Sequence, residues 1–443
     1  MQIRNSVSRR ELLRIGGISL LSGPLLGSLS SAPALSESAA ERREHSCIFL
    51  MLQGGPSHHD LWDPKPTASS EIRGPFQTIA TKIAGERFGE LLEKTAQVSD
   101  HIAVVRSMTH KFTNHIAGTY ITVTGSTNQP DRDREAELND FPGPGAILNY
   151  LGRASSVPRS ISLPNWLSIP GPSNRMPGQY GGFLGGIHDP FLVKGDPNQK
   201  DFRPLALRWP AGMTTPRMQG RLGLLDQLDE AAGELENDLS QRYDHLRQSA
   251  YELVTDGGVR DALNLEFEKP STRDRYGRTK IGQSLLLARR LIEAGVQFVG
   301  YNEFNQKWDT HGDLANRYKS IVPPLDQAYS ALIEDLEQRG MLPKTMVVNA
   351  GEFGRTPVMN KGAGRDHWPN VYSIALAGGG ISGGQIYGAS DSKGAEVLNK
   401  PTSPADVLAT LWRHLGVAPK TEIQDQLKRP HQVSNGRALS ELL

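Results

Sequence analysis

The sequence predicts an α/β fold in which helices cover both faces of a mostly parallel central sheet. Five apolar runs are continuous rather than alternating with polar residues, which is typical of strands buried on both faces. These runs are residues 47–52, 102–105, 296–299, 345–348 and 372–376. Helical patterns separate several of them, and strands that alternate with helices indicate a parallel sheet between two helical layers.

The helical patterns have recognisable ends. Amphipathic or capped segments predict helices over residues 281–294, 313–339 and 404–415. Gly295 and Gly340 follow the first two segments, as expected at helix C-termini, and Ser403 supplies a cap for the third.

A loop-rich insertion is expected at about residues 155–255. Its first part is rich in Pro and Gly, and leucines then recur at helical spacing from Leu225 to Leu253. This spacing predicts an amphipathic helix that packs on the main body or on a partner helix. The chain thus divides into one domain over residues 47–420, which contains the insertion, and a C-terminal tail over residues 421–443.

The composition excludes some classes of function. The 443 residues include 49 Lys or Arg and 48 Asp or Glu, so the formal net charge of +1 gives no electrostatic case for binding nucleic acid. Cys47 is the one cysteine, which excludes an intramolecular disulfide and a cysteine-based metal site. We expect Cys47 to be buried and the stability to come from the core.

The N-terminus predicts a twin-arginine signal peptide over residues 1–34. Arg9 and Arg10 precede a short apolar run over residues 15–29, and residues 32–34 (Ala-Pro-Ala) supply a small-residue cleavage site. The alternative is an uncleaved membrane anchor, but the run is shorter than the roughly 20 residues that a span needs. We therefore expect cleavage, export through the twin-arginine machinery to the periplasm or cell envelope, and no stable membrane span afterwards.

Three polar clusters predict a divalent metal site. They occupy residues 308–313, 351–355 and 364–369. Imidazoles beside carboxylates offer neutral nitrogen and anionic oxygen donors, and the carboxyl ends of parallel strands bring such loops together. The expected ligands are Asp309, His311, Glu352 and His367. Zinc is the expected ion, with calcium or manganese as alternatives, although any one of these residues alone would be an ordinary hydrogen-bonding loop residue.

The loop after the first strand, residues 54–60, is a further candidate. Its glycines would let backbone N–H groups approach an anion. His58 and Asp60 would add metal ligands or acid–base groups, whereas His59 is left without a role because two adjacent histidines do not readily share one. The alternative is a solvated turn with helix-capping Ser57 and Asp60.

Three residues are candidates for catalysis. Thr113 stands at a strand–helix junction, where a metal could lower the pKa of its hydroxyl and make it a nucleophile. Equally, Thr113 could be a plain N-cap with His115 in the first helical turn. Arg355 could clamp an oxyanion bidentately, or pair with Glu352 or Asp366.

Taken together, these motifs resemble an exported bacterial family of unknown function within the alkaline phosphatase and sulfatase superfamily. The resemblance covers roughly residues 47–417. It is carried by residues 54–60, 287–296, 308–313, 351–357 and 364–369. It implies an alkaline phosphatase-like sheet and hydrolysis of phosphate or sulfate esters at one or two metals, with a Ser, Thr or modified Cys nucleophile. Asp309, His311 and His367 match the family's metal ligands best.

The sequence departs from the superfamily pattern at three places. Gln53 stands where the first strand usually ends in a metal-binding Asp, and Glu352 replaces the Asp of a usual Asp-His pair. His115 occupies the position of the sulfatase Cys or Ser, about ten residues before Thr124 and Gly125. A standard sulfatase is therefore not expected.

The leading hypothesis is an exported, metal-dependent hydrolase of phosphate or sulfate esters. Its substrate would be an ester-bearing small molecule or a polysaccharide. The alternative is a catalytically inactive relative that binds an envelope glycan or a protein partner.

Overall fold

The computed structural model describes residues 45–152, 157–169, 175–200, 202, 217, 220, 257–303 and 305–443. The predicted signal peptide, the predicted leucine-rich helix and most of the predicted insertion lie outside these residues. In the part of the chain that is described, no helix combines the length and the apolar character that crossing a membrane requires.

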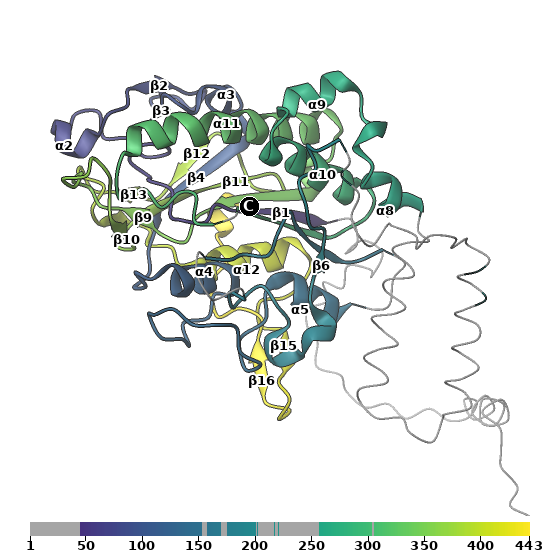
Figure 1. Ribbon diagram of the computed structural model, residues 1–443. Coiled ribbons are helices and arrows are strands. Elements are labelled where there is room, and N and C mark those ends of the chain that lie inside the picture. Colours follow the sequence, from purple (N-terminus) through teal and green to yellow (C-terminus); the bar gives the residue numbers. More distant parts are fainter. Residues whose placement is uncertain are drawn as a thin grey trace, which may run out of the picture. The chain divides into compact units, whose positions relative to one another are not determined.

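Within the described residues, the core is an eight-stranded sheet with the strand order β12-β4-β11-β8-β1-β7-β5-β6 (Figure 1). The strands are β1 (Ser46–Met51), β4 (Ile102–Met108), β5 (Ser160–Leu163), β6 (Phe191–Leu192), β7 (Phe298–Asn302), β8 (Thr345–Ala350), β11 (Tyr372–Ala377) and β12 (Gln385–Tyr387). Neighbouring strands are parallel except that β11 runs antiparallel to β4 and β8. All five predicted strands form, and the predicted mostly parallel sheet is confirmed.

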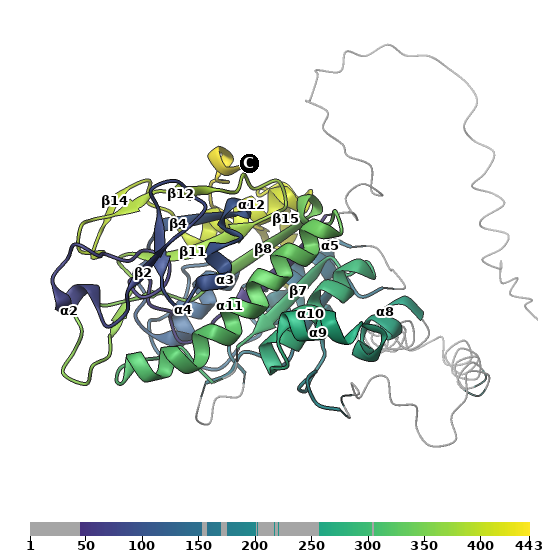
Figure 2. The same cartoon turned by 90° about the horizontal axis from the view of Figure 1, so that it is seen from above.

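Helices cover both faces of this sheet (Figures 1 and 2). One layer contains α3 (Glu93–Ala96), α10 (Lys280–Glu293) and α11 (Leu314–Gln338), and the other contains α4 (His115–Thr124), α5 (Pro144–Leu151) and α12 (Pro404–His414). Alternate side chains of β1 enter the two cores, because successive residues of a strand face opposite sides. Ile48 and Leu50 pack with Leu332 of α11, whereas Phe49 packs with Ile116 of α4 and Trp412 of α12.

The predicted helices match α10, α11 and α12 to within a residue or two at each end. Ser403 caps α12 as expected, and Asp406 completes a capping box with it. The remaining helices are α2 (Ser70–Arg73), α8 (Gly257–Ala262) and α9 (Pro270–Tyr276), with 3₁₀ turns η2 (Ser99–His101), η3 (Gly182–Leu184), η4 (Gly186–His188), η6 (Leu265–Phe267), η7 (Leu342–Lys344) and η8 (Ser440–Leu442).

The described residues also form four antiparallel strand pairs outside the main sheet. They are β2 (Thr78–Ala80) with β3 (Arg87–Gly89), β9 (Gly354–Arg355) with β10 (His367–Trp368), β13 (Ala389–Ser390) with β14 (Val397–Asn399), and β15 (Glu422–Gln424) with β16 (Pro430–Gln432). The segment predicted as a C-terminal tail contributes Ile423, Val433 and Leu442 to the core that contains α12. These residues are therefore packed onto the domain.

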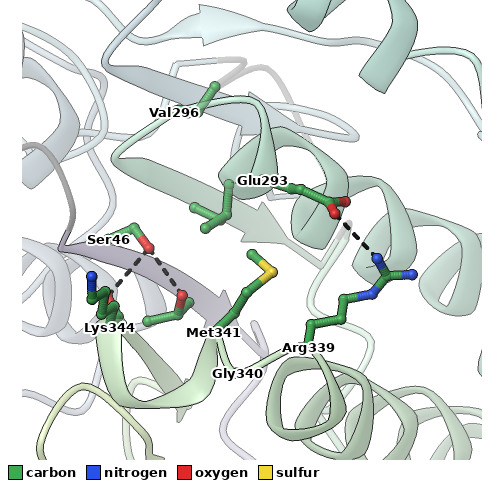
Figure 3. A pocket seen from close by; sticks show the side chains of 10 residues that line it. Ser46, Glu293, Val296, Arg339, Gly340, Met341 and Lys344 are labelled. Carbon is green, nitrogen blue, oxygen red and sulfur yellow. Dashed lines mark hydrogen bonds and ion pairs between the residues drawn. The ribbon is translucent and has the colours of Figure 1, made fainter.

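The topology gives the sheet two distinct edges. The carboxyl ends of β1, β4, β7 and β8 share one edge with the amino end of antiparallel β11. At the opposite edge a cavity of about 440 Å³ opens beside the first residues of β1 and β8 (Figure 3). Its lining includes Ser46, Thr345 and the ion pair between Glu293 and Arg339, whose nitrogen and oxygen are 3.1 Å apart.

Candidate metal centre

Polar residues from four segments converge at the carboxyl edge of the sheet. The segment between β7 and α11 carries Asp309 and His311, and the segment after β4 leads into His115, the first residue of α4. Glu352 follows β8, and His367 lies in β10, just before β11. Because β11 is antiparallel to its neighbours, the residues that precede it reach the same edge as the residues that follow the parallel strands.

Asp309 lies at the middle of this cluster. Its Oδ2 is 3.4 Å from Nε2 of His115, and its Oδ1 is 3.1 Å from Nε2 of His311 and 3.3 Å from Nε2 of His367. The Nε2 atoms of His311 and His367 are 3.0 Å apart. Ligands bound tetrahedrally to zinc at about 2.0–2.1 Å are about 3.3 Å from one another, so the spacing of Oδ1 of Asp309 and the Nε2 atoms of His311 and His367 suits one ion.

Nδ1 of each of the three imidazoles makes a hydrogen bond that fixes the orientation of the ring. The pairs are His115 with Oε1 of Glu352 at 2.6 Å, His311 with Oδ1 of Asp366 at 2.6 Å, and His367 with the carbonyl oxygen of Thr113 at 2.7 Å. A carboxylate or a carbonyl only accepts, so each Nδ1 carries the proton and donates it. The Nε2 of each ring faces Asp309, and a ring held through Nδ1 with Nε2 directed at the site is the arrangement that metal-binding histidines adopt.

This arrangement concentrates unshared electron pairs. With their Nδ1 atoms donating, the neutral rings of His311 and His367 would present Nε2 lone pairs to each other across 3.0 Å, and the buried Nε2 of His115 lies 3.4 Å from Oδ2 of Asp309. Neighbouring lone pairs repel unless a cation or a proton lies between them. The donor set therefore fits a divalent metal ion.

The electrostatics of the cluster also favour positive charge. Burial lowers the pKa of His115, but interactions with Asp309 and Glu352 outweigh it and raise that pKa to about 9. Burial raises the pKa of Asp309, but His115, His367 and Arg355 hold it well below its usual range. Asp309 is therefore ionised, and a proton on His115 occupies the place that a metal would take.

Glu352 supports the cluster from a fully buried position. Its carboxylate accepts N–H groups from Gly54, at 2.8 and 3.0 Å, and from Gly55, at 3.0 Å, besides Nδ1 of His115. The predicted approach of glycine amides to an anion thus occurs, with the protein's own carboxylate as the anion. Gly54 has a φ of +115°, and a Cβ there would lie 2.4 Å from the backbone nitrogen of Asp309.

Arg355 holds Asp309 and the glycine loop together. Its buried guanidinium donates from Nη2 to Oδ1 of Asp309 at 2.7 Å and to the carbonyl of Gly54, and from Nε to the carbonyl of Gly55 at 2.8 Å. The remaining nitrogen, Nη1, donates to the carbonyl of Arg365 at 3.0 Å. Arg355 therefore pairs with Asp309 rather than with Glu352 or Asp366 as considered from the sequence, because Asp309 is the carboxylate that its buried side chain reaches.

Thr113 contributes its carbonyl to the cluster, not its hydroxyl. Oγ1 of Thr113 donates to Oδ2 of Asp131 at 2.9 Å. Asn114 caps α4 by accepting the N–H of Ile116 at 2.9 Å, so the interpretation of Thr113 as the N-cap is wrong by one residue. His115 does begin the first turn of the helix, as predicted.

His58 and Asp60 bind groups outside the cluster around Asp309. Nε2 of His58 donates to the carbonyl of Gly394 at 2.9 Å, and Oδ2 of Asp60 accepts from Nε of Arg365 at 2.9 Å. Among the described residues, one group whose ligand atoms all lie within 4.8 Å of one another is His115, Asp309 and His367, and His311 contacts two of its members, Asp309 at 3.1 Å and His367 at 3.0 Å. The sequence reasoning therefore placed His115 in the site but did not count it among the ligands, and it did not identify Asp366 as the partner of His311.

A family model for a protein of unknown function (DUF1501) matches residues 44–443. No curated protein matches the sequence. Among solved structures, the chain is similar to a sulfatase from Pseudoalteromonas sp. at 12% identity, covering 86% of this chain and 69% of that one, with a TM-score of 0.41.

Two further similar structures have different activities. They are the lipoteichoic acid synthase from Listeria monocytogenes (9% identity, 89% and 76% of the two chains, TM-score 0.41) and the phosphonate monoester hydrolase of Agrobacterium radiobacter (10%, 90% and 77%, TM-score 0.39). These likenesses are too distant to carry an argument about the chemistry of the centre.

Proposed function

We propose that this chain, which belongs to the DUF1501 family of proteins of unknown function, is a metal-dependent hydrolase of phosphate or sulfate esters with an alkaline phosphatase-like fold. One observation carries the proposal. Three imidazoles, each fixed through Nδ1, direct their Nε2 atoms at the ionised carboxylate of Asp309.

The donor set favours zinc over calcium. His115, His311, His367 and Asp309 would hold the ion through three nitrogens and an oxygen, whereas calcium takes about six to eight oxygen ligands. A bound divalent ion polarises an ester oxygen and lowers the pKa of water. Manganese remains the second choice, because imidazole and carboxylate together also suit it.

The protein's own groups fix the geometry of this centre. Glu352 and Asp366 hold the rings of His115 and His311, and Arg355 holds Asp309. We favour water over Thr113 as the nucleophile, because Asp131 binds the hydroxyl of Thr113.

The cellular setting follows from the N-terminal sequence. Arg9 and Arg10 with the apolar run behind them support export by the twin-arginine route and cleavage after about residue 34. The mature protein would then act in the periplasm or cell envelope on an ester-bearing small molecule or polysaccharide.

A second candidate function is binding of an envelope glycan or protein partner without catalysis. The observation that favours it is the 2.7 Å contact between Arg355 and Oδ1 of Asp309. A guanidinium at that distance already neutralises the central carboxylate and competes with a metal for it.

The experiment that separates the two uses the mature protein purified from the exported fraction. For the hydrolase, elemental analysis finds about one zinc per chain, and a panel of phosphate, sulfate and phosphonate esters contains at least one substrate. His367→Ala then loses both metal and turnover. Absence of stoichiometric metal in the wild type would overturn the metal centre, whereas bound metal without turnover of any ester favours the binding function.

A further inference from the structure

The motif His58-His59-Asp60 follows β1 and does not enter the cluster around Asp309, yet all three side chains are almost completely buried. We propose that these residues are positioning residues that hold β10, and therefore His367, in place from two sides. The inference rests on the proposed metal centre, in which His367 is a ligand.

The first side is held by Asp60 through Arg365. This guanidinium is fully buried and donates from Nε to Oδ2 of Asp60 at 2.9 Å, from Nη1 to the carbonyl of Thr356 at 3.0 Å, and from Nη2 to the carbonyl of Ile72 at 2.8 Å. Asp60 supplies the charge that a buried guanidinium requires. Arg365 is two residues before His367, so this pair anchors the entrance to β10.

The backbone of Arg365 joins two other parts of the centre. Its N–H donates to the carbonyl of Thr310 at 3.0 Å, and its carbonyl accepts Nη1 of Arg355 at 3.0 Å. Thr310 lies between Asp309 and His311. Fixing Arg365 therefore fixes the segment of His367 relative to the segment that carries Asp309 and His311.

The second side is held by the two histidines through the turn over residues 391–396. Nε2 of His58 donates to the carbonyl of Gly394 at 2.9 Å, and Nε2 of His59 donates to the carbonyl of Lys393 at 2.8 Å. Burial lowers the pKa of His58 to about 4 and that of His59 well below its usual range, so both are neutral donors. Gly394 has a φ of +63°, and a Cβ there would lie 2.6 Å from Nε2 of His59.

The same turn accepts hydrogen bonds from residues that follow His367. Nε1 of Trp368 donates to the carbonyl of Ala395 at 2.7 Å, and Nδ2 of Asn370 donates to Oε1 of Glu396 at 2.9 Å. His58 also lies close to Gly354, the residue that pairs with Trp368. A Cβ added at Gly354 would be 2.6 Å from Nδ1 of His58. Hydrogen bonds thus hold both the entrance to β10 and its exit.

The composition of these anchors indicates positioning rather than stability alone. Apolar residues of the same volume are often at least as stabilising as a buried ion pair such as Asp60–Arg365. Directional hydrogen bonds instead define where a backbone lies, and functional groups need to be held within about 0.5 Å of their working positions. The ring of His367 has that requirement, because its Nε2 has to meet the same ion as Asp309.

The test measures binding of Co²⁺ alone to the mature protein, by calorimetry and by the visible absorption of the bound ion, whose intensity reports coordination geometry. Asp60→Asn removes the negative charge that pairs with Arg365, and His58→Phe keeps a ring but removes the donor to Gly394. Both variants should weaken Co²⁺ binding about tenfold or more and change the spectrum. His58→Gln, which retains an N–H donor, should restore most of the affinity.

A matched control lies at the other end of α11. Glu268 pairs with the buried guanidinium of Arg289 at 2.6 Å, and Arg289 also pairs with Asp335 at 2.9 Å. Asp335 is 21 residues beyond the start of α11 at Leu314, which corresponds to about 30 Å along the helix. Glu268→Gln should therefore lower the melting temperature without changing Co²⁺ affinity or spectrum.

The outcomes separate this inference from the proposed function. A wild-type protein that binds no Co²⁺ removes the metal centre and this inference with it. A wild type that binds Co²⁺ while Asp60→Asn and His58→Phe bind it with unchanged affinity and spectrum removes only the positioning role. An equal loss of affinity in Glu268→Gln assigns the effect to general stability and also removes that role. If Asp60→Asn does not fold, His58→Phe and His58→Gln decide the question.

Discussion

The two edges of the central sheet differ in what their polar groups do. At the amino edge, a cavity of about 440 Å³ is lined by groups that pair with each other, such as Glu293 with Arg339 (Figure 3). At the carboxyl edge, three imidazoles direct their Nε2 atoms at Asp309. The difference teaches that the cavity and the convergent donors lie at opposite edges of the sheet, and the proposed metal centre rests on the donors rather than on the cavity.

The largest expected effect comes from removing the centre of the carboxyl edge. Asp309→Ala should reduce zinc affinity by more than about 100-fold, because all three imidazoles share this one carboxylate. Metal content by elemental analysis and ester turnover check the prediction. Asp309→Asn is the matched control for folding, since its amide oxygen can still accept from Arg355. Normal metal content in Asp309→Ala would show that the donors do not act together.

A smaller effect is expected from Glu352, which binds the proposed ligand His115 rather than the metal itself. Glu352→Gln should weaken zinc binding by about 10- to 100-fold, because the amide holds Nδ1 of His115 less strongly than the carboxylate does. Competition with a chelator of known affinity measures the change. The variant should also unfold at lower denaturant concentration, because Gly54 and Gly55 lose a charged acceptor for their N–H groups. Unchanged metal affinity would indicate that Glu352 serves the fold alone.

Sensitivity to acid is expected at both edges. Burial lowers the pKa of His58 and His110 at the carboxyl edge, and of His414 at the amino edge, from 6.5 to about 4. At these three histidines the unfolded chain binds more protons than the folded one, so their contribution to stability is complete above about pH 6.5 and falls as the pH decreases towards 4. Each unit of difference in pKa corresponds to about 1.4 kcal/mol. Urea unfolding at pH 7.5, 5.5 and 4.5 measures this slope.

Substitution of His414 separates the contribution of the amino edge to this pH dependence from that of the carboxyl edge. Nε2 of His414 donates to the carbonyl of Ser46 at 2.9 Å, and His414→Gln keeps a donor there but does not titrate. Its unfolding free energy should depend less steeply on pH than that of the wild type. An identical slope would mean that His414 does not contribute.

The smallest effect is expected from the ion pair beside the amino-edge cavity. The side chains of Glu293 and Arg339 are 47% and 34% exposed, so solvent screens their attraction. Glu293→Gln should change the unfolding free energy by less than about 1 kcal/mol and leave metal content unchanged. A loss of metal in this variant would contradict the separation of the two edges.

The sequence predicted the fold better than it predicted the contacts within the site. Continuous apolar runs are a direct consequence of burial on both faces. The strands that carry the site segments, β1, β4, β7, β8 and β11, could therefore be recognised. The direction of β11 could not be recognised in this way, because the same run of residues suits a parallel or an antiparallel neighbour. That direction brings His367 to the edge where Asp309 lies.

The roles of individual polar residues were harder to predict. His115 and Asp366 belong to the centre, but the partners that show this are far away in the chain: His115 is 237 residues from Glu352. His58 and Asp60 have the residue types of metal ligands, yet they are buried among Gly394 and Arg365. Residue type and local spacing are the same in both cases, so the local sequence cannot distinguish a ligand from a buried anchor.

By itself, the sequence determined the strands β1, β4, β7, β8 and β11, the helices α10, α11 and α12, and the concentration of histidines and carboxylates in a few loops, because these depend on local periodicity and composition. The tertiary structure decided which nitrogen of each imidazole makes the orienting hydrogen bond and which nitrogen faces Asp309. It also decided that Glu352 and Arg355 support the centre and that the His58-His59-Asp60 motif anchors β10. The physical reason is that a hydrogen bond depends on distance and direction in space, and residues more than 200 positions apart acquire both only when the sheet brings their strands together.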